Sequence, residues 1–426
     1  YVEITQQQLA SSTAADVAVP FSLPEGAFGS GTLQKGATYQ FDEDTKVLTI
    51  SAAGQIDDFN SPKVAPWESY SHWIKEVVIE SGVTHIGKNA FHGFDALTSL
   101  TVPYDITADP AAFGDCDTIT KVTVPDHWTF DSGALDISSN NALKTPLPWA
   151  VLKERITNIN IADAVTTDIT KDIFAGCTKL TDVVIKNKTA KIAEDAFKDC
   201  SALTHVEVTD TWKYADGALS ILANEAVKDP VPWTSLKDRV TKVVISTGVT
   251  GIEESTFAGM DKLTDDVAQR PPVVLFEGDA KSWGAAGAAC DKFGLKAGND
   301  KYLIVSFANG SLIGKCGDDA SFSFDGTDTL TIEGTKIDNY GTNTSGVIYE
   351  DGQSKAPWYS VRGRISKLEM PDITEIGAFA FYSCTKLESV AISNKVTSIG
   401  DYAFAKCEKL TTLTIDPSGS DLLIGK

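Results

Sequence analysis

The segment ITEIGAFAFYSCTKLESVAISNKVTSIGDYAFAKCEKLTTLTI, residues 373–415, contains the same pattern of apolar residues and cysteine twice. The second copy begins 23 residues after the first. In the first copy the pattern consists of Ile373, Ile376, Phe381, Cys384, Leu387, Val390 and Ile392. A fixed internal period predicts stacked units that place equivalent side chains in one core.

Five further copies of the pattern begin at Val83, Ile106, Val165, Ala190 and Val249. In all seven copies a phenylalanine stands six residues before a hexad of the form apolar-x-x-apolar-x-apolar. These are Phe91, Phe113, Phe174, Phe197, Phe257, Phe381 and Phe404. The hexad alternates at its end, which predicts a short strand with one buried face. One such unit cannot bury its own apolar face, so we expect successive units to stack about 4.8 Å apart as a parallel ladder.

A second repeat combines a Pro-Trp pair with a predicted hairpin. Trp67, Trp149, Trp233 and Trp358 each stand seven residues before the same hexad, so tryptophan takes the place of phenylalanine in four coils. With these coils the predicted ladder has eleven strands. Alternating apolar residues around a turn predict a hairpin before each Pro-Trp coil, at residues 39–50, 127–137, 211–221 and 322–332.

These patterns divide the chain into five parts. Residues 1–36 read as a leader or linker, and residues 418–426 as a C-terminal tail. Residues 37–264 contain three modules of hairpin, Pro-Trp coil and Phe coils, and residues 319–417 contain a fourth. Residues 265–318 hold an apolar run, an Ala-rich helix-like stretch and a strand-like run. We interpret them as an irregular coil that contains a helix, with a separate domain as the alternative.

The charge of the chain excludes two classes of partner. Its 426 residues include 37 Lys and Arg against 58 Asp and Glu, a net charge of −21. Such a chain repels nucleic-acid phosphates and anionic lipids. The sequence also lacks an apolar run of the roughly 20 residues that span a bilayer. Because it starts at Tyr1, we interpret it as a trimmed product whose export signal is out of view.

The two C-terminal copies carry Ile-Gly, Ala-Phe, Cys and then Leu-x-x-Val-x-Ile or its close equivalent. In this respect the chain resembles the BspA-like leucine-rich repeat family of bacterial surface proteins. Phe94 and Met260 replace the expected cysteine, and Ile-Gly becomes Ile-Thr at Ile169 and Ile-Ala at Ile192. The resemblance adds to the patterns above, which together predict a mainly β leucine-rich-repeat solenoid, with a parallel ladder, inserted hairpins and short helical turns. It also implies an exported or surface-anchored protein associated with adhesion, and it transfers no catalytic residues.

Five of the seven cysteines occupy one repeat position. They are Cys116, Cys177, Cys200, Cys384 and Cys407. Apolar residues replace them elsewhere, so we interpret them as buried free thiols. Stacked pairs lie close enough for a disulfide, but their side chains run parallel rather than converging. Cys290 and Cys316 lie outside the repeats and are the better candidates for a disulfide. Without a CxxC pair, a zinc site is not expected.

No other set of residues predicts catalysis or a cofactor. The five histidines, His72, His85, His92, His127 and His205, read as exposed side chains. Asp42, Glu43 and Asp44 suit a calcium ion or a solvated turn, and we favour the turn because the calcium-loop pattern is missing. A phosphate loop at residues 310–317 is one residue short and is rejected. We therefore expect no catalytic, cofactor or metal residues.

The aromatic residues and the ladder face are the remaining places for a binding site. The Pro-Trp tryptophans keep register with buried hexads and are expected to pack in the core, whereas Trp73 and Trp283 fall outside that register. The third and fifth hexad positions should face outward. They contain no aromatic residue and no Arg, the residue types that dominate protein hot spots. The binding residues therefore stay unknown.

The sequence as a whole favours a non-enzymatic, exported or cell-surface binding protein. Adhesion through an extended repeat surface is the first hypothesis. A passive spacer that displays another domain is the alternative, and a hydrolase that uses acidic side chains is a remote third. Expected partners are host or microbial surface proteins or glycans, without membrane insertion, and we expect a monomer.

Overall fold

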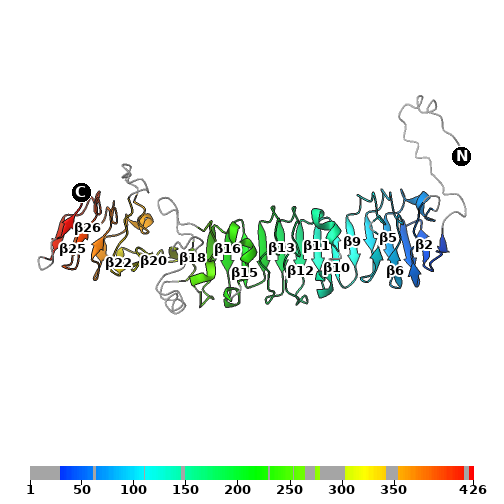
Figure 1. Cartoon of the computed structure of the whole chain (residues 1–426), viewed down its shortest axis with the longest axis horizontal. Coiled ribbons are helices and arrows are strands. Elements are labelled where there is room, and N and C mark those ends of the chain that lie inside the picture. Colours follow the sequence, from blue (N-terminus) through cyan, green and yellow to red (C-terminus); the bar gives the residue numbers. More distant parts are fainter. Residues whose placement is uncertain are drawn as a thin grey trace, which may run out of the picture. The chain divides into compact units, whose positions relative to one another are not determined.

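The computed structural model describes residues 29–60, 64–109, 111–144, 149–228, 231–252, 254–263, 274–278, 303–341, 354–416 and 422–426. The chain forms two compact units, Tyr1–Pro125 and Asp126–Lys426. Both consist mainly of short strands (Figure 1). None of the helices in the described ranges has the length and apolar character to cross a membrane.

The first unit contains two sheets. The larger sheet has the order β1 (Ser30–Thr32), β2 (Thr38–Asp42), β3 (Val47–Ser51), β5 (Glu76–Ile79), β7 (Ser99–Thr101) and β9 (Lys121–Val124). The smaller one contains β4 (Gly54–Gln55), β6 (Val83–Ile86) and β8 (Thr107–Ala108). One 3₁₀ turn, η2 (Glu68–Tyr70), follows Trp67. The β2–β3 hairpin is antiparallel, whereas β3, β5, β7 and β9 run parallel as successive rungs.

The second unit repeats this plan. Its long sheet contains β10 (Trp128–Asp131), β11 (Ala134–Ile137), β12 (Asn158–Ile161), β13 (Asp182–Ile185), β14 (His205–Val208), β15 (Trp212–Ala215), β16 (Ala218–Ile221), β17 (Lys242–Ile245), β18 (Val274–Phe276), β19 (Val305–Phe307), β20 (Leu312–Lys315), β21 (Ser321–Phe324), β22 (Thr329–Glu333) and β23 (Lys367–Glu369). Two small parallel sheets follow, β25 (Ser389–Ile392) with β27 (Thr412–Ile415), and β24 (Glu375–Ile376) with β26 (Ser398–Ile399) and β28 (Leu423–Ile424). The 3₁₀ turns are η3 (Asn140–Leu143), η4 (Ala150–Arg155), η5 (Asn224–Val227), η6 (Thr234–Arg239), η7 (Glu254–Phe257) and η10 (Tyr359–Val361).

All four predicted hairpins are present as antiparallel pairs, β2–β3, β10–β11, β15–β16 and β21–β22. The prediction that the hexads form a single parallel ladder is wrong in two respects. The hairpin strands enter the same sheet, so that β14 pairs antiparallel with β15 while β16 pairs parallel with β17. In addition, β25 and β27 form a sheet of their own. The hexad that starts at Leu263 continues outside the described residues.

The register of the ladder explains the repeat. Ile159 pairs with Val183, and Val183 with Val206, so that the same hexad position recurs on each rung. All three side chains are fully buried. Because alternate residues of a strand point to opposite faces, the intervening residues face outward. The predicted mainly β solenoid with inserted hairpins is therefore confirmed.

Aromatic rings of successive coils stack inside this core. Trp149 lies 5.5 Å from Phe174, and Phe174 lies 5.6 Å from Phe197, with interplanar angles of 20° and 10°. The same stacking joins Trp67 with Phe91, Phe91 with Phe113, Trp358 with Phe381, and Phe381 with Phe404. Phe113 and Phe404 are half-buried, whereas the other five repeat phenylalanines are at most 1% exposed.

The region predicted as an irregular coil contributes strands where the structure describes it. β18 pairs parallel with β17 and with β19, which continues the ladder. β20 then turns back antiparallel to β19 and pairs with β21. The helix-like stretch at residues 283–293 lies outside the described residues. The domain boundaries at residues 36, 264, 318 and 417 stay predictions.

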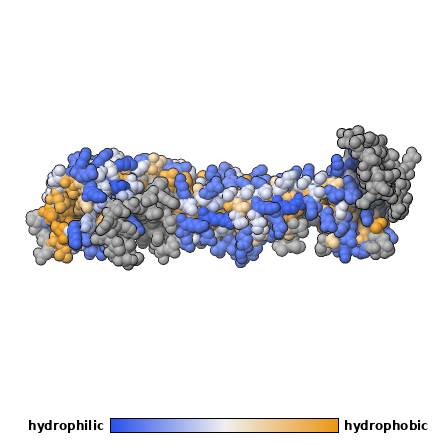
Figure 2. All heavy atoms as spheres, turned by 90° about the horizontal axis from the view of Figure 1, so that it is seen from above, coloured by the Kyte–Doolittle hydropathy of each residue, from blue (hydrophilic) through white to orange (hydrophobic). Residues whose placement is uncertain are grey.

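Apolar surface gathers toward the C-terminal coils of the second unit (Figure 2). Leu413, Ile415, Leu423 and Ile424 are between 41% and 71% exposed. Every residue of β27 is exposed, although β25 carries the same alternation with Val390 and Ile392 buried. Burial of a repeat position therefore depends on the coils beside it.

Candidate functional site

The outward face of the ladder is the surface that the repeat presents most regularly. The predicted outward positions are all half-buried or exposed, which confirms their assignment. They are Glu76, Val78, Ser99, Thr101, Lys121, Thr123, Asn158, Asn160, Asp182, Val184, His205, Glu207, Lys242, Val244, Lys367, Glu369, Ser389, Ala391, Thr412 and Thr414. Polar and charged side chains of both signs dominate this face.

Several of these side chains interact with one another. The amide Nδ2 of Asn160 donates a hydrogen bond of 2.7 Å to Asp136 on the neighbouring strand. His205 lies 3.6 Å from Asp182 through Nδ1 and 3.7 Å from Glu207 through Nε2. This part of the face is therefore polar but largely satisfied by its own neighbours, and its side chains form no convergent catalytic set.

The Pro-Trp tryptophans pack in the core, as predicted. All four are at most 1% exposed. Nε1 of Trp67 donates to the carbonyl of Ala90 at 2.8 Å, and Nε1 of Trp358 to that of Ala380 at 2.9 Å, each in the next coil. They offer no exposed ring for a sugar. Trp73 is half-buried, with Nζ of Lys46 5.3 Å from the centre of its ring, and Trp283 lies outside the described residues.

The histidines belong to separate surface contacts. His72 pairs with Asp95 at 2.7 Å, and His92 pairs with Asp115 at 3.3 Å. The hydrogen bonds of His85 to Thr107 and of His127 to Ser139 measure 2.8 Å and 2.6 Å. His72 and His92 are exposed as predicted, whereas His85, His127 and His205 are half-buried between strands or turns. Within the described ranges, no group of three or more His, Cys, Asp or Glu is placed to hold a metal ion.

The acidic turn at Asp42, Glu43 and Asp44 is exposed, and its backbone N–H groups donate hydrogen bonds to one of its own carboxylates. Oδ1 of Asp42 accepts hydrogen bonds from the backbone N–H groups of Thr45 at 3.0 Å and Asp44 at 2.9 Å. These two bonds lower the pKa of the Asp42 carboxyl. The carboxylate thus stabilises the hairpin turn. This agrees with the interpretation of residues 42–44 as a solvated turn.

The repeat cysteines are free thiols, and four of the five are buried. Burial raises the pKa of Cys177 to about 12. Cys407 differs because it is half-buried, and its pKa is lowered by a hydrogen bond from the thiol of Cys384. The prediction of a buried core position is therefore wrong for Cys407. Cys316 is a free thiol at 2% exposure, and Cys290 lies outside the described residues.

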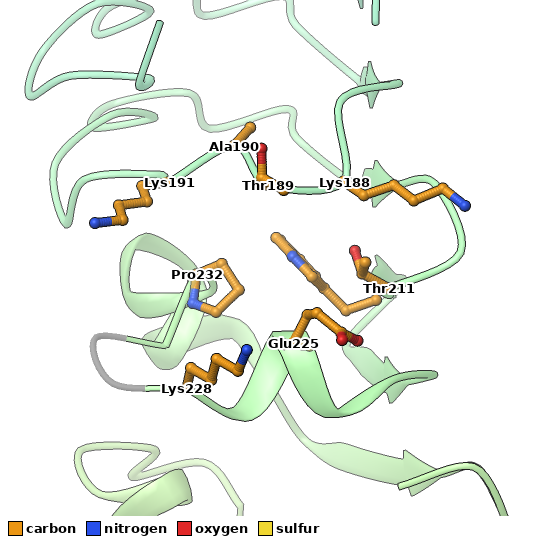
Figure 3. Close-up of a pocket in the computed structure, with 10 residues that line it drawn as sticks. Lys188, Thr189, Ala190, Lys191, Thr211, Glu225, Lys228 and Pro232 are labelled. Carbon is orange, nitrogen blue, oxygen red and sulfur yellow. The ribbon is translucent and has the colours of Figure 1, made fainter. Parts of the chain in front are cut away.

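A pocket of about 200 Å³ opens between one Phe coil and the following Pro-Trp coil. Lys188, Lys191, Lys228, Thr211 and Glu225 line it. Figure 3 shows Lys188 and Lys191 pointing outward in opposite directions, and Nζ of Lys188 pairs with Asp210 at 2.7 Å. The lysines therefore do not converge on one ligand position.

A larger groove, of about 750 Å³, lies beside β23 and β25. Sequence reasoning missed it, although a signal existed. In most coils the next apolar position stands four residues after the last hexad residue, as Val165 does after Ile161, whereas Ile373 stands only three residues after Met370. The shortened corner marks the place where the ladder opens.

Three solved structures are similar to the chain. A leucine-rich repeat protein from Eubacterium ventriosum has 16% identity over 91% of this chain and 85% of that protein, with a TM-score of 0.23. A leucine rich cell surface protein from Faecalibacterium prausnitzii has 16% identity over 92% and 95%, with a TM-score of 0.19. A leucine-rich repeat protein from Bacteroides ovatus has 15% identity over 91% and 89%, with a TM-score of 0.22.

Among curated proteins, none matches the sequence. One family model does match, that of the BspA type leucine rich repeat region, in six copies. The matches cover residues 69–146, 149–219 and 358–422, about half of the chain. These residues include Trp149, Trp358 and the six phenylalanines that stack with tryptophan or with one another in successive coils. The chain therefore belongs to the BspA-type leucine-rich repeat family.

Proposed function

We propose that this protein is an exported, cell-surface adhesion module that binds macromolecules without catalysing a reaction. The observation that carries the proposal is the outward ladder face, which repeats half-exposed polar positions from rung to rung. A face without Trp, Tyr or Arg offers weak individual contacts. Weak contacts that are linked along one chain gain by effective concentration, so a long repetitive face can still adhere.

A binding experiment that varies the display density tests this proposal. The full chain is offered to a panel of extracellular matrix proteins and glycans, once in solution and once at high density on beads. We expect weak binding by the soluble chain and an apparent gain of about 10²-fold or more on the beads. Replacing a ladder-face residue such as His205 by Ala should change binding by no more than about twofold, because no single residue is an anchor.

Two results would point elsewhere. If the dense beads bind nothing in the panel, the self-satisfied polar face around Asn160 and His205 favours the alternative of a passive spacer. If the chain hydrolyses a substrate, and one Asp or Glu substitution abolishes the reaction, the remote hydrolase alternative replaces the adhesion proposal.

A further inference from the structure

The ladder opens at one junction of the second unit, between β23 and β25. At a closed junction, the backbone N–H groups of Thr204 and His205 both donate to the carbonyl of Thr181 at 3.0 Å. Within the described residues 365–370 and 387–392, no backbone hydrogen bond joins Glu388 or Ser389 to Ser366, the corresponding residues. The edges of β23 and β25 that face one another are therefore unpaired.

The shortened corner after β23 accounts for the opening. Pro371 follows the hexad and has no N–H, whereas at other corners this N–H bonds the preceding coil, as Lys186 does to Ile161 at 2.9 Å. Proline alone is insufficient, because Pro103 occupies the same position after β7, which still pairs with β9. The distinguishing feature is the three-residue step to Ile373. Nζ of Lys395 donates hydrogen bonds to this short corner, at 3.3 Å to the carbonyl of Pro371 and at 2.5 Å to Oδ1 of Asp372.

The opening exposes apolar side chains that other junctions bury. Leu368 and Met370 are half-buried, whereas Val183 and Ile185 at the same hexad positions are fully buried. The groove is lined on one side by Leu368, Met370 and Pro371 and on the other by Ala391 and Ile392. Ala391 is exposed and small. At about 750 Å³ the groove falls in the range of ligand-binding sites.

The charge of the groove is negative. Glu369 and Asp416 belong to its lining, which contains no Lys, Arg or His. Oγ1 of Thr331 donates a hydrogen bond of 3.2 Å to Oε2 of Glu369. The net charge of −21 adds a long-range attraction for cations. A ligand with both apolar and basic side chains matches this surface.

We propose that the groove binds an extended peptide segment of a partner protein, with apolar side chains that alternate with Lys or Arg. The peptide lies along the outward mouth of the groove, across β23 and β25, because these strands approach one another within 8 Å and leave no room for a third strand between them. Its apolar side chains contact Leu368, Met370 and Ile415, and its basic side chains face Glu369 and Asp416. This inference rests on the proposed function as a binding protein and names one site and the chemistry of its ligand.

Selection of peptides on the full chain tests the inference. A random peptide library is displayed and selected for binding, and the enriched peptides are synthesised and titrated by fluorescence polarisation. We expect the selected sequences to alternate apolar and basic residues. Ala391→Trp fills the groove and should weaken binding by about tenfold or more, and Glu369→Lys should weaken the same peptides through charge repulsion.

Val184→Trp is the matched control, because Val184 holds the same hexad position on β13, where the strands are paired. It should leave peptide binding within about twofold of the parent chain. Circular dichroism establishes that each variant folds. The inference is overturned if no alternating peptide is enriched, or if both groove variants bind the enriched peptides as well as the Val184→Trp control does.

Failure here is distinguishable from failure of the proposed function. If Ala391→Trp and Glu369→Lys adhere to matrix proteins on dense beads as the parent chain does, while no peptide occupies the groove, the adhesion proposal stands and the groove assignment is wrong. If the peptides bind the groove but the beads adhere to nothing, the adhesion proposal fails and the groove remains a peptide site.

Discussion

Two pairs of coils in the second unit share one pattern but differ in their surroundings. Phe174 and Phe197 stand 23 residues apart, as do Phe381 and Phe404, and in each case cysteines follow at the same spacing. In the first pair both phenylalanines and both cysteines are fully buried or nearly so. In the second pair Phe404 and Cys407 are only half-buried.

The neighbouring strands explain this difference. β13 and β14 have paired strands on both sides, since β12 precedes them and β15 follows. Within the part of the chain that the structure describes, β25 and β27 pair only with each other. A repeat unit therefore acquires its core from the coils beside it, and identical residues contribute unequally to stability.

The largest expected effect is the loss of an interior ring. Phe197→Ala should lower the free energy of unfolding by about 3–5 kcal/mol, because it removes a buried ring from the stack. Phe404→Ala should cost about 2 kcal/mol, because part of that ring already contacts solvent. Denaturant unfolding followed by circular dichroism measures both, with Val184→Ala, at a half-buried position of the outward ladder face, as the control. Equal losses at Phe197 and Phe404 would contradict the comparison.

Lengthening the short corner should close the open junction. Inserting one Asn after Pro371 restores the four-residue step, so that Ser389 and Ala391 can donate to β23 at about 1 kcal/mol for each hydrogen bond. Hydrogen exchange at these two amides should then slow. The same insertion after Ala162, in a corner of ordinary length, should slow no exchange. Unchanged exchange at Ser389 would show that the corner does not cause the opening.

Thiol reactivity should follow the same contrast. Cys407 should react first with a thiol reagent at about pH 8, because it is half-buried and its pKa is lowered. Cys177, whose pKa burial raises to about 12, should react only after denaturation. Mass spectrometry of the modified peptides gives the order, and Cys407→Ser is the control. Faster modification of Cys177 than of Cys407 would contradict the conclusion that Cys407 is the more exposed of the two thiols.

The smallest effect concerns an exposed ion pair between the coils of the first pair. The hydrogen bond to Asp210, and then its charge, raise the pKa of Lys188. Its stabilising effect is therefore complete below the ordinary lysine pKa and is lost as pH rises through the higher folded value. Lys188→Gln should lower Tm slightly near about pH 8 and less near about pH 11.5. Lys186→Gln, which removes no ion pair within the described residues, is the control.

The sequence predicts the local elements of this fold well. The hairpins, the Phe and Trp stacking and the inward or outward direction of each hexad residue follow from spacing and alternation. The open junction does not, because the hexad before Met370 fits the general pattern and only the corner length differs. The half-burial of Phe404 and Cys407 could not be predicted either, because the repeat pattern around them matches the pattern around Phe197 and Cys200. The groove beside Ala391 depends both on the short corner and on the incomplete burial of the C-terminal coils.

The backbone hydrogen bonds of the second unit run from each coil to the next. A load that pulls the coils apart is therefore carried in series, and every junction bears the full force. In the described residues β23 and β25 share no backbone hydrogen bonds, so their coils are held by the pairing of β24 with β26 and by side chains such as Lys395. Under tension we expect this junction, which lacks the hydrogen bonds of the long sheet, to yield before a junction whose ladder strands are also paired, and to divide the unit into an extensible C-terminal segment and a stiffer remainder.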